Sequence, residues 1–116
     1  MQDKDIHKMC EKYGIENYTI NTDGSIDVDG DVYLWNKGLT KLPLKFNHVS
    51  DDFICSWNQL NTLEGSPQLV GGYFDCGYNN LTTLEGAPKS ISGNFSCMKN
   101  QLTTLEGAPK SLGGYF

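Results

Sequence analysis

The sequence has little positive charge, no long apolar run and no leader-like start, and each absence argues against a class of protein. Nine Lys plus Arg against fourteen Asp plus Glu give a formal net charge of −5, the wrong sign for binding phosphate backbones. No apolar run approaches the roughly 20 residues that cross a bilayer. The N-terminal residues Met1 to Asp5 lack the basic and apolar regions of a signal peptide. We therefore expect a cytoplasmic protein that binds neither nucleic acid nor membranes.

The remaining composition is that of one globular domain. The chain has 116 residues, of which 38% are hydrophobic and 20% charged, so it is neither disordered nor large enough for a second core. Thirteen glycines are the unusual feature. They recur at a fixed spacing and therefore do not form a flexible linker.

A unit of 21 residues repeats through most of the chain. It reads Phe-x-Cys-x-x-Asn-x-Leu-x-x-Leu-Glu-Gly-x-Pro, and its copies begin at Phe53, Phe74 and Phe95. A degenerate copy precedes them, with Lys37 at the asparagine position. Internal repeats of this length are typical of solenoids. We predict an array over residues 31–116, with about four coils and an incomplete last strand.

The repeat resembles the leucine-rich repeat family, whose core pattern is Leu-x-x-Leu-x-Leu-x-x-Asn-x-Leu. In the third copy, counting the degenerate one as the first, the pattern is matched by Phe74, Cys76, Asn79 and Leu81, whereas Gly71 occupies its first leucine position. The wording Leu-Thr-Thr-Leu-Glu-Gly-Ala-Pro is similar to a short form found in bacteriophage and bacterial proteins. The resemblance implies a repeat solenoid, mainly β, with a parallel sheet on its concave face.

The residues predict the same arrangement. Alternation around Phe74 and Cys76 has the period of a strand, which points both side chains inward. Asn79 is expected to bind backbone groups of neighbouring coils through its amide. Each return segment is too short for a long helix, so we expect it to be extended, polyproline-like or a single 3₁₀ turn.

An N-terminal cap is predicted over residues 1–30, because a stacked array exposes apolar ends. Helical spacing of apolar residues indicates a short helix from Asp5 to Tyr13, followed by Gly14 as its stop. Alternation around Asp23 and Gly24 predicts a β-hairpin. The C-terminal end shows no cap, which suggests a homodimer through this end; a final strand simply left open is the alternative.

No catalytic, cofactor or metal site is predicted. Three cysteines, at Cys55, Cys76 and Cys97, occupy inward positions and are expected to be buried free thiols, since no Cys-x₂-Cys pair is present. The run from Asp27 to Asp31 fits an EF-hand poorly and is interpreted as a solvated turn. His7 and His48 have no nucleophile motif beside them. The chain is therefore expected not to be an enzyme.

The positions that vary between copies are interpreted as free from the demands of the fold, and hence as candidates for binding. On the strand face they include both tryptophans of the chain. Exposed aromatic side chains carry much of the energy of protein interfaces. The predicted partner-binding residues are Tyr33, Trp35, Ile54, Trp57, Tyr73, Asp75, Tyr78 and Met98.

These residues predict a non-enzymatic protein–protein interaction module. The resemblance implies a narrower role, a phage or bacterial protein that inhibits or adapts a host protein in the host cytoplasm. Two alternatives remain open on the residues: a carbohydrate or small-ligand binder that uses the aromatic patch, and an acidic mimic of nucleic acid. The first would need a pocket, and the second would show a steep salt dependence of partner binding.

Overall fold

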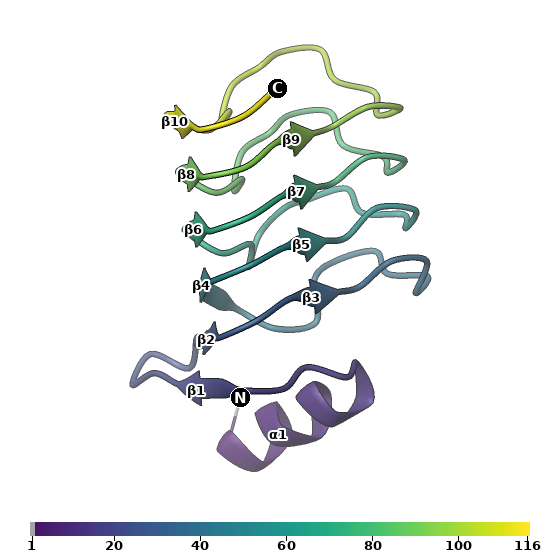
Figure 1. The fold of residues 1–116 in the computed structure, drawn as a ribbon. Helices are drawn as coiled ribbons and strands as arrows, with labels where there is room; N and C mark the ends of the chain where they lie inside the picture. The colour runs from purple at the N-terminus through teal and green to yellow at the C-terminus, as the bar shows by residue number, and fades with distance from the viewer. Residues whose placement is uncertain (1) are drawn as a thin grey trace.

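The computed structural model describes residues 2–116 and is a β-solenoid with a short helical cap. Helix α1 (Asp3–Lys12) precedes an antiparallel hairpin of β1 (Tyr18–Ile20) and β2 (Ile26–Val28). The chain then winds through stacked coils, with α1 beyond β1 at the N-terminal end of the stack (Figure 1). The prediction of a mainly β repeat solenoid with a helix and hairpin cap is confirmed.

Two sheets run along the stack. Sheet A has the order β1-β2-β4-β6-β8-β10, and sheet B has the order β3-β5-β7-β9. Every pairing except β1 with β2 is parallel. The later strands are short: β3 (Val32–Tyr33), β4 (Phe46–Val49), β5 (Phe53–Ile54), β6 (Leu69–Val70), β7 (Phe74–Asp75), β8 (Ser90–Ile91), β9 (Phe95–Ser96) and β10 (Ser111–Leu112).

Sheet B is the parallel sheet that the repeat predicts, whereas sheet A was not predicted. The return segments, expected to be extended, end in the strands β4, β6, β8 and β10, which pair with one another. Strand β2 belongs both to the hairpin and to sheet A, so the cap and the array share one sheet. Each coil therefore presents two consecutive strands with a corner between them.

A spine of phenylalanine rings fills the core. Phe53 pairs in register with Phe74, and Phe74 with Phe95. Their ring centroids lie 5.5 Å and 5.7 Å apart, within the range of favourable aromatic pairs. Cys55 and Cys76 are fully buried beside this spine, and Cys97 is partly buried. All are free thiols, as predicted from their inward positions.

The asparagine of each repeat joins neighbouring coils, as predicted. Asn79 Oδ1 accepts a hydrogen bond from the Leu60 N–H at 3.0 Å. Its Nδ2 donates to the carbonyls of Cys55, Cys76 and Gly77 at 3.0 to 3.1 Å. Asn58 and Asn100 make the corresponding bonds in their own coils. These amides satisfy the backbone groups that the chain frees where it leaves sheet B.

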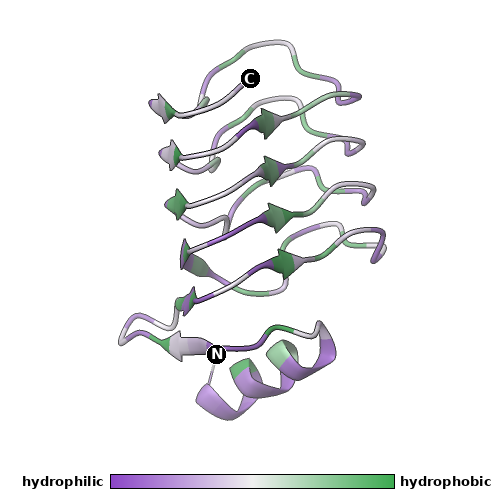
Figure 2. Cartoon of the chain, viewed as in Figure 1, coloured by the Kyte–Doolittle hydropathy of each residue, from purple (hydrophilic) through white to green (hydrophobic). Residues whose placement is uncertain are grey.

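Helix α1 covers the N-terminal end of the core. Ile6 and Cys10 are buried, and Met9 and Tyr13 pack partly buried against the core. The rest of the helix is mostly hydrophilic (Figure 2). Gly14 follows with a φ of 67°, a left-handed conformation that ends the helix. The predicted cap helix is therefore present, with slightly different bounds.

Candidate functional site

The aromatic side chains that the sequence singled out lie on sheet B and in the segments that directly follow its strands. In β3, Val32 is buried and Tyr33 is exposed, and this alternation continues through β5 and β7. Tyr33, Trp35 and Trp57 remain 55%, 54% and 51% exposed. We call Tyr33, Trp35, Trp57 and Tyr78 the aromatic face. Large apolar side chains kept in water on neighbouring coils are typical of an interaction surface.

Two rings of this face stack on each other across neighbouring coils. The centroids of Trp57 and Tyr78 lie 4.0 Å apart, and their planes differ by 8°. Because both residues hold the same position in successive repeats, the spacing of the coils brings the rings into contact. The stack holds both side chains in one orientation, which lowers the entropy cost of fixing them against a partner.

The backbone beneath this stack is strained. Trp57 has a φ of 59° and Tyr78 a φ of 54°, in the left-handed region that bulky side chains rarely adopt. The first coil has Asn36 at this position, with a φ of 53°, and asparagine tolerates such angles well. The fold therefore needs a left-handed residue here but does not need an aromatic one.

The other predicted residues lie around this face with less exposure. Ile54 and Asp75 are half-buried on β5 and β7, and Tyr73 is half-buried just before β7. Met98 is 58% exposed and its side chain covers Gly77, where an added Cβ would lie 3.2 Å from Met98 Cγ. Tyr73 and Met98 both line a hollow of about 410 Å³ at the C-terminal coils.

Three acidic positions on this surface also support the fold, so the inference that all variable positions are free of it was wrong. Asp31 Oδ1 accepts the Asp52 N–H, and Asp52 Oδ1 accepts the Tyr73 N–H, both at 2.8 Å. Asp75 Oδ1 accepts the Gly77 N–H at 2.9 Å. Asn94 repeats the first arrangement with its amide oxygen on the Tyr115 N–H. These bonds need an oxygen acceptor, and an amide serves as well as a carboxylate.

Asp31, Asp51 and Asp52 give the part of the aromatic face around Tyr33 a negative potential. The charge of Asp31 is the main cause of a raised pKa at Tyr33, and Asp52 and Asp51 add to it. Negative charge near a phenol disfavours its ionised form.

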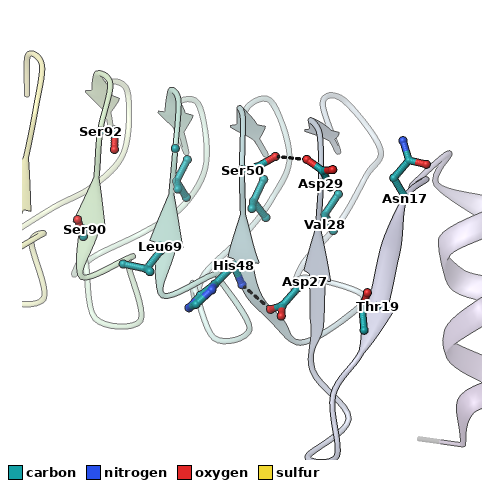
Figure 3. Close-up of a pocket in the computed structure, with 13 residues that line it drawn as sticks. Asn17, Thr19, Asp27, Val28, Asp29, His48, Ser50, Leu69, Ser90 and Ser92 are labelled. Carbon is teal, nitrogen blue, oxygen red and sulfur yellow. Dashed lines mark hydrogen bonds between the residues drawn. The ribbon is translucent and has the colours of Figure 1, made fainter.

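Sequence reasoning missed a groove on the outer face of sheet A. It has a volume of about 510 Å³ and crosses β1, β2, β4, β6 and β8. Leu69 is 43% exposed within it. Figure 3 shows Asp27, His48, Leu69 and Ser90 in one row across these strands. The small residues Gly71, Ser90 and Ser92 leave the groove open, and the available signal was the 21-residue spacing of Gly71 and Ser92.

The polar groups of this groove hold the sheet together. Asp27 Oδ1 accepts hydrogen bonds from Asn21 and Asn47 and from the His48 backbone N–H. Burial alone would raise the pKa of Asp27, but these bonds outweigh it and lower the pKa. Ser50 donates to Asp29 and accepts from the Gly30 N–H. His48 thus meets Asp27 through its backbone, which is not the ring contact that acid–base catalysis uses.

Within residues 2–116, no group of three or more His, Cys, Asp or Glu side chains is arranged to hold a metal ion. Burial raises the pKa of the Cys55 and Cys76 thiols above the ordinary value, which disfavours the reactive thiolate. In the same part of the chain, no helix has the length and apolar character needed to cross a bilayer.

Comparison of the chain with protein-family models, curated proteins and solved structures gives no match. Its function must therefore be argued from its own surface.

Proposed function

We propose that this chain is a non-enzymatic protein-binding module whose aromatic face contacts a partner protein. The observation that carries the proposal is the stacked pair Trp57 and Tyr78 on left-handed backbone, in which Trp57 is 51% exposed and Tyr78 is half-buried. The fold accounts for the left-handed backbone at this position, which Asn36 and Lys99 share, but it does not account for the aromatic side chains, so these need another reason to be there. Binding through these rings is such a reason.

The energetics of interfaces support this use of the surface. Trp and Tyr are enriched among the residues that dominate binding, each with a truncation cost of about 2 kcal/mol or more. Here the coils hold the rings in place before binding, which reduces the entropy lost on association. A rigid face of this kind would act by covering a functional surface of the partner.

A sugar or small-ligand site on the same rings is less well supported. Trp57 and Tyr78 cover one face of each other, so each ring offers only one face for stacking on a ligand. A protein surface can use the ring edges as well as the free faces.

The compartment and the kind of partner belong to the same proposal. Four free cysteines, three of them buried, are compatible with the reducing cytoplasm. The resemblance of the repeat to short leucine-rich repeats of phage and bacterial proteins is the basis for a narrower proposal. In it the partner is a host protein that this module inhibits or adapts.

Affinity capture from a cytoplasmic extract of the encoding organism or its host tests the proposal. The variant Trp57→Asn/Tyr78→Asn removes the stack and places at both positions the residue type that Asn36 already shows to fit. Leu69→Ser is the matched control, because it removes an exposed apolar side chain from sheet A. Thermal unfolding should show both variants folded.

We expect a protein that binds the wild type and Leu69→Ser and that the double asparagine variant loses. Each lost ring should weaken binding by about 30-fold, the equivalent of about 2 kcal/mol. Capture of nothing by the wild type, or equal capture by all three proteins, would contradict the proposal.

A further inference from the structure

The aspartates of the first two coils gather at one end of the aromatic face. They lie at the corners between sheet A and sheet B, where residues 29–31 join β2 to β3 and residues 50–52 join β4 to β5. The later coils have Gly72 and Gly93 where the second coil has Asp51, and Tyr73 and Asn94 where the first two have Asp31 and Asp52. The first two coils therefore carry Asp31, Asp51 and Asp52, and Tyr33 and Trp35 lie in the first of them; Asp75, on β7, is the acidic residue of this face in the third coil.

Within the described chain, none of the carboxylates of Asp31, Asp51 and Asp52 forms an ion pair. Residues 2–116 contain one ion pair, between Lys45 and Asp23. Asp31 and Asp52 each use one carboxylate oxygen on a backbone N–H, and Asp51 is exposed. A hydrogen bond to an N–H does not remove the negative charge of a carboxylate, and the charge of Asp31 lies close enough to Tyr33 to raise the pKa of its phenol.

We propose that this end of the aromatic face binds a lysine- or arginine-rich segment of the partner protein, with cationic side chains on Tyr33 and Trp35 beside Asp31, Asp51 and Asp52. The inference rests on the proposed function and names the chemistry of the partner. Ring faces attract cations, with Trp the best of them. Carboxylates next to the rings add ion pairs and speed up association.

The structure offers a charge change that spares the fold. Asn94 holds the position of Asp31 and Asp52 in a later coil, and its amide oxygen accepts the same backbone bond at 2.8 Å. Asp31→Asn/Asp52→Asn should therefore remove two charges and keep both hydrogen bonds. Glu85→Gln/Glu106→Gln is the matched control, since it removes two charges from exposed turns elsewhere.

The test measures the binding of a short fluorescein-labelled peptide of alternating Arg and Ser by fluorescence anisotropy. We expect the wild type to bind it, and a Glu-Ser peptide of equal length not to bind. Asp31→Asn/Asp52→Asn should weaken binding about tenfold, and Trp35→Ala by a similar factor, whereas the Glu85/Glu106 control should change it less than about twofold.

Failure of this inference can be told apart from failure of the proposed function. No binding of the Arg-Ser peptide, or equal weakening by both charge variants, would overturn the basic-segment assignment. If the partner is still captured through Trp57 and Tyr78 in that case, the proposed function stands without it. If capture also fails, both are rejected.

Discussion

Asn79 is a single residue on which two neighbouring coils depend. Its amide is buried and bonds to Leu60, Cys55, Cys76 and Gly77. Asn79→Ala would leave these backbone groups unsatisfied, so we expect a loss of about 3 kcal/mol in the free energy of unfolding. Urea denaturation measures it.

The neighbouring Asn80 provides the control for that prediction. It is exposed, so Asn80→Ala should change the free energy of unfolding by less than about 0.5 kcal/mol. Equal losses in the two variants would show that the buried amide does not hold the coils together.

At the residue scale, the sequence predicted inward residues better than it predicted surface ones. Phe, Cys and Asn recur every 21 residues because the core and the backbone impose the same demand on every coil. The acceptor role of Asp31 was missed, because the requirement is only for an oxygen, which Asp and Asn both supply. The left-handed backbone at Trp57 was missed because a bulky residue does not indicate this conformation in the sequence. Asn36, which holds the same position in the first coil, was the one available indication.

At the scale of elements, the β1–β2 hairpin is expected to depend on the ionisation of Asp23. The Ser25 hydroxyl and backbone N–H bind the Asp23 carboxylate at 2.6 and 3.0 Å, and with Lys45 they hold its pKa at about 2. The unfolded chain should have the ordinary value, about 3.9. Because the folded pKa is the lower one, this stabilisation is complete above about pH 5 and is lost as the pH falls through about 4 to 2.

Thermal unfolding of the wild type and Asp23→Asn at several pH values measures this contribution. The Tm of the wild type should fall more steeply than that of the variant between pH values of about 5 and 2. Parallel curves would show that Asp23 has the same pKa in both states. Asp27, whose pKa is also lowered, should act in the same direction in both proteins and cancel in the comparison.

Sheet A shows why some elements were not predicted. Strands β6, β8 and β10 contain two residues each, and the residues around them lack the apolar alternation that Phe74 and Cys76 show in sheet B. They form because each return segment lies in register with that of the preceding coil. Their pairing therefore depends on the stacking of the coils and not on the local sequence. The helix and the hairpin were predicted because apolar spacing and Asp23-Gly24 are local signals.

At the scale of the whole molecule, stability should spread from coil to coil. Each repeat of a solenoid contacts only its neighbours, and α1 seals the first coil with Ile6, which is 1% exposed. Ile6→Ala should cost about 2–4 kcal/mol. Its effect on hydrogen exchange should be largest in β1, β2 and β3 and smallest in β9.

Hydrogen–deuterium exchange with mass spectrometry would follow this gradient. Lys8→Ala, an exposed change on the same helix, should leave exchange unaltered. A uniform increase in exchange along the chain would instead mean that the solenoid opens as one unit.

The aromatic face, on sheet B and the segments that follow its strands, is the surface that we propose binds a partner protein. The most direct measurement places the photo-crosslinking residue benzoyl-phenylalanine at Trp35, at Trp57 or, on sheet A, at Leu69. We expect irradiation in cells to link one and the same protein to positions 35 and 57 and not to position 69. Crosslinks from position 69 alone, or from none of the three, would contradict the proposal.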